Sequence, residues 1–173
     1  MKFFSANLQD LRELYTNSLQ KTLDMEQQIT KALPTMIEKA SDPQLKQAFE
    51  THLEETRTHV TRVEGILEQA IGETSTIKCK GISALVSEAE DMIKDSSDPS
   101  VRDAALIAAA QQVEHHEMAI YGTLRTWAEI LGETEQAATL DSILDEEKNA
   151  DSLLTAISSR VNEDADLPIN RAA

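Results

Sequence analysis

Cysteine, glycine and proline are scarce in this sequence. The single cysteine, Cys79, excludes an intrachain disulfide and a metal site built from several thiolates. Five glycines and four prolines in 173 residues leave few turn positions, which favours long uninterrupted elements. Alanine, leucine, glutamate, glutamine and lysine dominate between those positions, and all have high helix propensity. We therefore predict an all-α protein in which residues 1–173 form one domain.

The sequence also has no long apolar run and has fewer basic than acidic residues. No segment reaches transmembrane length, and the N-terminus turns polar directly after Phe4, so it has no signal-peptide core. We expect a cytoplasmic protein. With 16 basic against 31 acidic residues, the net charge is −15. Phosphate backbones and anionic membranes repel such a chain, so we expect neither nucleic acid nor membrane partners, whereas metal cations suit it.

Four stretches have apolar residues at intervals of three and four, which predicts four long amphipathic helices. Asp-Pro pairs restart the chain twice, with the aspartate as the cap and the proline at the first helical position. We expect the helices to begin near Asn7 (as the N-cap), Asp42, Asp98 and Thr134. The bundle should span about residues 7–161, followed by a loose tail over 162–173.

The segment between the second and third long helices, residues 72–98, has a different pattern. A polar stretch, GETSTIKCKG, precedes a shorter amphipathic helix that carries Ile82, Leu85 and Ile93. A connection of this length is a crossover rather than a hairpin. A four-helix bundle with a long crossover after its second helix has the connectivity of ferritin-like folds.

Ionisable residues interrupt the apolar stripe of every long helix. In the second, HLEETRTH (52–59) places His52, Glu55 and His59 on the inward side, where charge is costly unless it is paired or coordinated. The other three helices contribute carboxylates at similar depth: Glu26, Glu114, Glu117, Glu147 and Asp151.

These residue types are those that bind paired metal ions. Carboxylates are hard donors that can bridge two cations, and imidazole suits iron, manganese and zinc. Two divalent ions also offset the cost of burying several carboxylates together. We predict a site for two metal ions, iron first and manganese or zinc as alternatives, among Glu26, His52, Glu55, His59, Glu114, Glu117, Glu147 and Asp151.

The spacing leaves the ligand set open. Ferritin-like sites usually carry Glu-x-x-His on two helices, whereas here the second helix has the reverse order and the fourth has no histidine. Either His52 or His59 is a ligand and the other a core histidine. Glu114 is a ligand or orients one, and Asp151 is a ligand or the partner of one.

Three segments, HLEET (52–56), RDAALIAAAQQVEHHEMAIYGTL (102–124) and LDEEKNAD (144–151), closely resemble the YciE/YciF-like family of bacterial ferritin-like proteins. The resemblance spans roughly residues 7–161. It implies a ferritin-like bundle, a homodimer and a role in stress responses. The family's motif implies a ligand role for Glu26, His52, Glu55, Glu114, Glu117 and Glu147. His59 and Asp151 are not part of that motif, and their assignment rests on helix periodicity alone.

Our first functional hypothesis is a ferritin-like protein with a di-iron or di-manganese carboxylate centre. Its expected chemistry is redox, namely iron oxidation or the reduction of peroxide or dioxygen in stress protection. The sequence assigns no catalytic residue and leaves open whether the protein is an enzyme. The alternatives are a structural or interaction protein that retains the carboxylates without turnover, and an iron store that would require a shell of many subunits.

Overall fold

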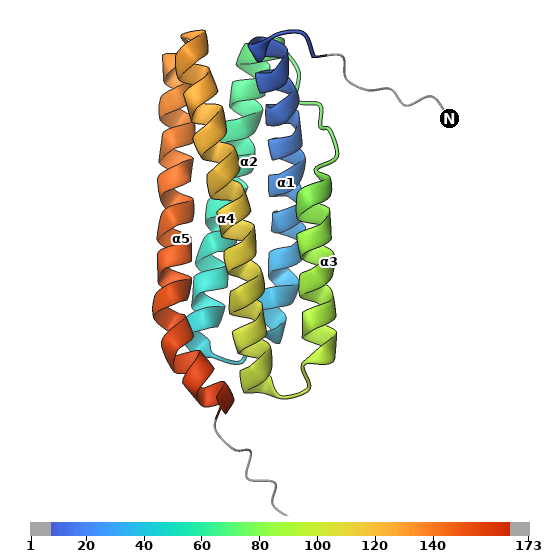
Figure 1. Ribbon diagram of the computed structural model, residues 1–173, viewed down its shortest axis with the longest axis vertical. Coiled ribbons are helices and arrows are strands. Elements are labelled where there is room, and N and C mark those ends of the chain that lie inside the picture. The colour runs from blue at the N-terminus through green and yellow to red at the C-terminus, as the bar shows by residue number, and fades with distance from the viewer. Residues whose placement is uncertain (1–7, 167–173) are drawn as a thin grey trace, which may run out of the picture.

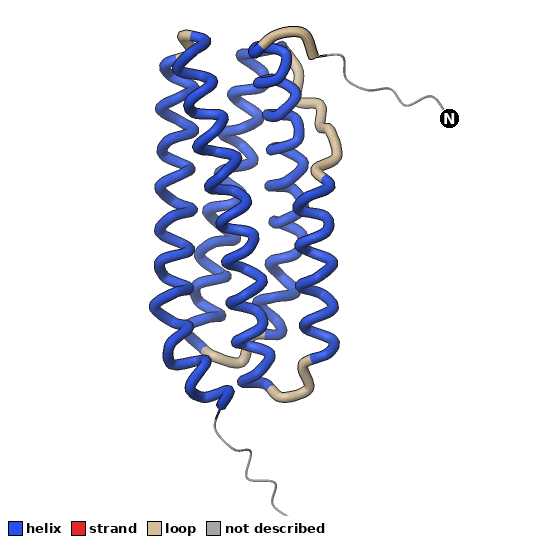
Figure 2. The backbone as a smooth tube through the Cα atoms, viewed as in Figure 1, coloured by secondary structure: helices blue, strands red, loops and turns tan. Residues whose placement is uncertain are grey.

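The computed structural model describes residues 8–166 of the chain. Within that range the chain is helical and contains no strand (Figures 1 and 2). The helices are α1 (Leu11–Lys39), α2 (Pro43–Ile71), α3 (Lys80–Asp95), α4 (Pro99–Leu131) and α5 (Thr134–Asp166). The prediction of an all-α, ferritin-like bundle with a short extra helix in its crossover is confirmed.

The four long helices are antiparallel to their neighbours around the bundle. α1 lies beside α2 and α4, and α5 lies beside α2 and α4 (Figure 1). The end of α2 and the start of α4 lie at opposite ends of the bundle, so the crossover must run its full length. α3 makes most of that passage, packed against α1 and α4.

Local sequence signals fix the ends of α2 and α4. Asp42 and Asp98 each accept hydrogen bonds from two backbone N–H groups in the first turn, and a proline follows each one. Gly72 and Gly132 then end the helices with φ of 71° and 78°, a left-handed conformation that favours glycine. The two Asp-Pro starts match the sequence predictions.

Both termini of the bundle differ from prediction. The N-cap of α1 is Asp10, whose carboxylate accepts from the Glu13 backbone N–H at 2.8 Å; the predicted cap, Asn7, lies outside the described residues. At the other end α5 continues to Asp166, so residues 162–166 of the expected tail are helical. An ion pair one turn apart, from Arg160 to Asp164 at 3.7 Å, supports this extension.

The crossover is anchored more firmly than its polar sequence indicated. Cys79, in the stretch we took for a polar linker, is only 7% exposed. Its backbone N–H donates to Asp24 of α1 at 2.7 Å, and Ser83 donates to Gln28 of the same helix at 2.8 Å. The start of α3 is thereby held against α1 at the level of the bundle's centre.

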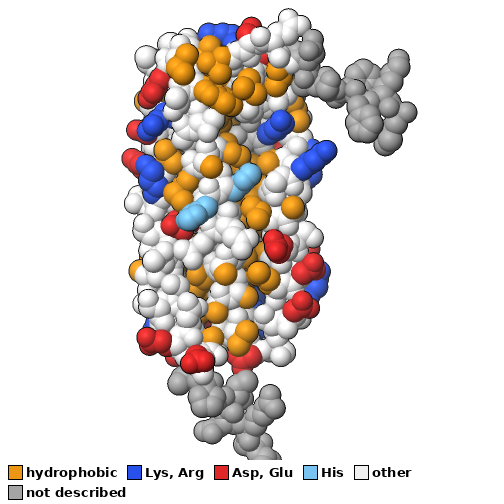
Figure 3. Space-filling model, viewed as in Figure 1, with side chains coloured by type: hydrophobic (Ala, Val, Ile, Leu, Met, Phe, Trp, Pro, Cys, Tyr) orange, Lys and Arg blue, Asp and Glu red, His pale blue; other side chains and the backbone are white. Residues whose placement is uncertain are grey.

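The packed interior runs the length of the bundle, with apolar residues of all five helices in one cluster. Apolar side chains also show along the face in Figure 3, with charged side chains distributed around them. Among residues 8–166, no helix is long and apolar enough to cross a membrane.

Candidate metal centre

Six ionisable side chains from the four long helices meet inside the bundle. Residues three, four or seven apart on an α-helix return to the same face. His52 and His59 are therefore stacked two turns apart on α2, and Glu114 and Glu117 lie one turn apart on α4. All six are buried: Glu26, His52, His59, Glu114, Glu117 and Glu147.

The six residues form two groups that share one member. In each group, one ligand atom per residue lies within 4.8 Å of the others. One group consists of Glu26, His59 and Glu147, and the other of His52, Glu114, Glu117 and Glu147. The shared carboxylate of Glu147 has two oxygens and lies where it can face two neighbouring cations.

His59 is the centre of the first group. Its Nδ1 lies 2.9 Å from Glu147 Oε1 and 3.7 Å from Glu26 Oε2, although neither contact is aligned as a hydrogen bond. Its Nε2 lies 2.7 Å from Oε2 of Glu146, which also pairs with Arg62. The outer contact with Glu146 therefore orients the ring so that Nδ1 points into the cluster.

His52 and Glu114 meet in the second group. Nε2 of His52 lies 3.3 Å from Glu114 Oε1, outside hydrogen-bond alignment. Among the alternatives left open by the sequence, the structure brings both histidines and Glu114 into the cluster.

Tyr121 contacts the first group, where its hydroxyl donates a hydrogen bond to Oε1 of Glu26.

Many of the buried oxygens have no hydrogen-bond partner. In the described part of the chain these are Glu26 Oε2, Glu114 Oε2, and both carboxylate oxygens of Glu117 and of Glu147. A buried, unsatisfied carboxylate oxygen is costly, because nothing replaces the water it has lost. Cations at the centre of each group would satisfy these oxygens, so the residues present fit a pair of metal ions.

The buried carboxylates lie close together, so the cluster binds protons more tightly than isolated side chains do. Burial raises the pKa of Glu117 well above its ordinary value, and the neighbouring carboxylates raise it further. Burial likewise raises the pKa of Glu114 to about 8, although His52 opposes the shift. Burial lowers the pKa of His52 and of His59, but adjacent carboxylates outweigh it and raise them to about 9 and about 10. Metal cations would take the place of these protons.

Two predicted ligands lie outside both groups. The Glu55 side chain is 42% exposed, and its Oε2 lies 3.8 Å from Nδ1 of His52. Asp151 is 20% exposed; it lies 3.4 Å from His115 Nε2 and accepts a hydrogen bond from Gln111. A spacing of three or four residues places a side chain on the inward side of its helix. Whether that side chain reaches the cluster depends on how the helix is rotated about its own axis. Their roles as ligands stay predictions.

Sequence analysis missed Glu146 and Arg62. Glu146 falls one position off the inward stripe of α5, which periodicity assigns to the surface, yet it touches His59. The adjacent pair Glu146-Glu147 was the available signal, since one of two consecutive carboxylates can enter the core while the other supports it from outside.

A four-helix bundle with a long crossover and a buried cluster of carboxylates and histidines defines the class: this is a ferritin-like protein with a candidate metal centre. The profile described as "Domain of unknown function (DUF892)" matches residues 10–166. The chain therefore belongs to the DUF892 family, and its similarity to YciF makes it a YciF-like protein.

Two similar proteins match nearly the whole chain. Protein YciF of Escherichia coli (strain K12) is 39% identical over 162 residues, which are 92% of this chain and 98% of YciF. The solved structure of that E. coli protein, called a stress protein, matches with a TM-score of 0.86 at 38% identity over 90% of this chain and 99% of YciF. YcfI of Rhodopseudomonas palustris, presented as a candidate structural protein, matches with a TM-score of 0.85 at 40% identity over 88% of this chain and 98% of its own.

Proposed function

We propose that this protein binds two metal ions at the buried cluster, where Glu147 would serve as a ligand of both. The observation that carries the proposal is the set of buried carboxylate oxygens without hydrogen-bond partners in residues 8–166. A bundle that needed no cation would be more stable with apolar side chains at these positions.

The two groups suggest how the ligands divide. Glu26 and His59 would hold one ion, and His52, Glu114 and Glu117 the other, with Glu147 shared. Glu55 stands at the exposed edge beside His52, from where its flexible side chain can complete the second set. Mixed oxygen and imidazole donors suit iron first, and manganese or zinc as alternatives.

Bound iron supplies redox chemistry, namely iron oxidation or the reduction of peroxide or dioxygen, and such chemistry fits the stress role named for the E. coli relative. The chain's own residues hold and shield the centre. Tyr121 orients Glu26, Glu146 orients His59, and the surrounding apolar side chains exclude water. We further propose, from the family resemblance, that the protein acts as a homodimer; its cytoplasmic location stays a prediction from the sequence.

A structural role is the second candidate. The description of the R. palustris relative favours it. In that case the cluster would stay protonated, and the bundle would serve only to bind a protein partner.

Substitution of the shared carboxylate separates the two functions. We expect Glu147→Gln, loaded anaerobically with ferrous iron and desalted, to lose most of the iron that the wild type retains, because one ligand of both ions is weakened. Asp145→Asn, an exposed carboxylate on the same helix, is the matched control and should retain it. Equal iron in both variants, measured by elemental analysis, would refute the assignment.

A further inference from the structure

The six clustered side chains are shielded from solvent, and none of them is more than 6% exposed. An ion from solution therefore needs a residue that is open to water and also contacts the cluster. In residues 8–166, two carboxylates outside the cluster contact its histidines: Glu55 lies beside His52, and Glu146 lies beside His59.

Glu146 is already engaged by a cation. Arg62 donates to both of its carboxylate oxygens, and Oε2 also lies 2.7 Å from Nε2 of His59. A metal ion that approached Glu146 would have to displace a guanidinium group, which is always charged. Glu146 therefore holds His59 in place but does not attract a second cation.

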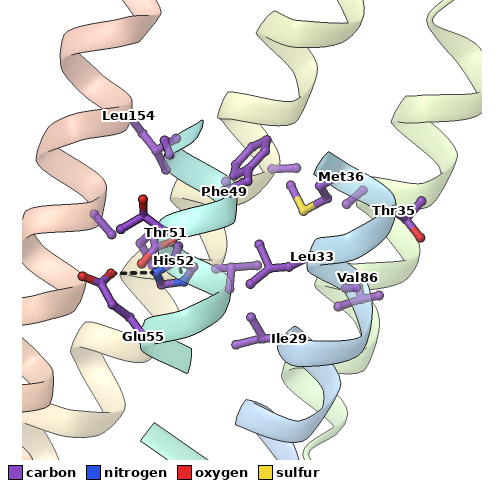
Figure 4. Close-up of a pocket in the computed structure, with 18 of the residues that line it drawn as sticks. Ile29, Leu33, Thr35, Met36, Phe49, Thr51, His52, Glu55, Val86 and Leu154 are labelled. Carbon is purple, nitrogen blue, oxygen red and sulfur yellow. Dashed lines mark ion pairs between the residues drawn. The ribbon is translucent and has the colours of Figure 1, made fainter. Parts of the chain in front are cut away.

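Glu55 has no such partner. Its side chain is 42% exposed, and its only ion-pair contact within the described chain is with His52, from Oε2 to Nδ1 at 3.8 Å (Figure 4). That distance is too long for a hydrogen bond. It suits two donors of one cation, because each donor would lie about 2.0–2.2 Å from an ion such as zinc.

The ring of His52 connects Glu55 to the second ligand group. Its Nδ1 faces Glu55, whereas its Nε2 lies 3.3 Å from Oε1 of Glu114. Both nitrogens are buried, and neither has a hydrogen-bond partner in the part of the chain that the structure describes. Because Nδ1 is closed to solvent, an ion must bind Glu55 before it can bind the ring.

A cavity of about 190 Å³ adjoins these two residues, and both line it. Thr51, Asn149 and Leu153 are exposed lining residues, so the cavity opens to solvent between α2 and α5. Small side chains leave room for Glu55 and the His52 ring to turn, which a tightly packed interior would not. Alanines from every helix contribute to this space: Ala32, Ala48, Ala89, Ala109, Ala110 and Ala150.

The His52 ring is itself positively charged in the metal-free protein. Burial lowers its pKa, but Glu114 and Glu55 raise it, to about 9 overall. A cation that binds the ring must therefore replace a proton. Glu55 is the negative group beside Nδ1, and it offsets the charges of the ring and the ion while they are close together.

We propose that Glu55 and Nδ1 of His52 form an entry site through which divalent cations, ferrous iron first, reach the second metal position from the opening between α2 and α5. Glu55 takes up the ion at the mouth of the cavity, and Nδ1 of His52 becomes its second donor. The ring then turns and carries it toward Glu114. This inference rests on the proposed metal centre, to which the entry site leads.

The rate of metal uptake tests the entry site. Cobalt(II) is the probe, mixed with metal-free full-length protein in a stopped-flow experiment that follows its visible absorption. We expect Glu55→Gln, which removes the charge but keeps the size of the side chain, to take up cobalt about tenfold more slowly than the wild type. Glu55→Asp keeps the carboxylate and should be slowed less. Glu90→Gln removes the same charge from an exposed lining residue of α3 and should keep the wild-type rate.

The uptake rate separates an entry site from a ligand. A residue that acts only as a ligand quickens release into a chelator when it is lost and leaves uptake unchanged, so that result for Glu55→Gln would overturn the inference. Equal slowing in Glu90→Gln would also overturn it, because overall charge alone would then set the rate. Slower uptake in Glu146→Gln than in Glu55→Gln would place the entrance at His59 instead.

The same measurements separate this inference from the proposed function. Wild-type protein that takes up no cobalt would refute the metal centre, and the entry site with it. Cobalt uptake that no change at Glu55 slows would refute the entry site alone.

Discussion

Glu147 projects from α5 into the centre of the bundle and belongs to both groups of candidate ligands. Its neighbour Glu146 faces partly outward and contacts His59. Of these two consecutive carboxylates, Glu147 lies within the cluster, whereas Glu146 contacts His59 from outside it. The support matters because an imidazole binds a cation best when its other nitrogen donates to a fixed acceptor.

Removing that support should weaken metal binding without removing a ligand. We expect Glu146→Ala to lower metal affinity by about 10-fold to 100-fold, the usual effect of losing an outer partner of a ligand. Glu146→Gln keeps a hydrogen-bond acceptor for His59, so it should lower metal affinity by less than Glu146→Ala does. Competition with a chelator measures both, and unchanged affinity in Glu146→Ala would show that His59 needs no such orientation.

Protonation of the cluster predicts how the metal-free protein responds to pH. Burial and neighbouring carboxylates raise the pKa of Glu114 from 4.5 to about 8. Burial lowers the pKa of His59, but Glu147 and Glu26 raise it from 6.5 to about 10 overall. Both groups bind protons more tightly when folded. Their stabilisation is complete below the unfolded pKa and is lost as pH rises through the folded one.

We therefore expect the melting temperature of metal-free protein to fall between pH 6 and pH 10, within the window that these two shifts define. Glu114→Gln cannot ionise, so it should flatten the part of the profile near pH 8. Thermal unfolding in the presence of a chelator measures this. A melting temperature that rises over the same range would contradict the account.

At the scale of elements, one buried carboxylate fixes the joint between α1 and α2. Asp103, in the first turns of α4, accepts from the backbone N–H groups of Ser41 at 2.8 Å and Asp42 at 2.7 Å. Sequence analysis did not single it out, because a carboxylate that caps a loop of other helices leaves no periodic signal. The short α1–α2 loop is thus held by the third long helix.

Substitution of Asp103 should destabilise the whole bundle. We expect Asp103→Ala to cost about 2 kcal/mol of unfolding free energy, since two backbone donors in partly buried hydrogen bonds lose a charged acceptor. Asp95→Ala, at the exposed end of α3, is the control and should change it by less than about 0.5 kcal/mol. Urea denaturation measures both, and equal effects would mean that the loop is held by packing alone.

The elements themselves were largely predictable, because their signals are local. Asp-Pro starts, glycine stops and the three-and-four spacing of apolar residues are each contained within one or two helical turns. The start of α1 was misplaced by a few residues because Asn7 and Asp10 both have cap chemistry, and only the backbone decides between them.

The centre was predictable in outline. Stripe periodicity brought Glu26, His52, His59, Glu117 and Glu147 inward. It could not separate Glu55 from these residues, because a modest rotation of α2 moves that side chain from the cluster to its exposed edge. The alanine-lined cavity could not be predicted from the sequence. An alanine leaves an empty space only where the facing helices also carry small side chains at the same height.

At the scale of the molecule, an acidic chain with a net charge of −15 encloses further carboxylates at its centre. Charged groups outside the bundle are solvated, whereas those inside need either protons or cations. The same cluster can therefore exist in a proton-bound and a metal-bound form. The second form should be the more stable near neutral pH, because cations satisfy more of the unpaired oxygens.

Elemental analysis of untagged protein, purified without a chelator, tests that central claim most directly. The account predicts close to two iron or manganese ions per chain, and a melting temperature that falls when they are removed. Protein that holds no metal as purified or after anaerobic iron loading, and that melts at the same temperature with or without a chelator, would contradict it.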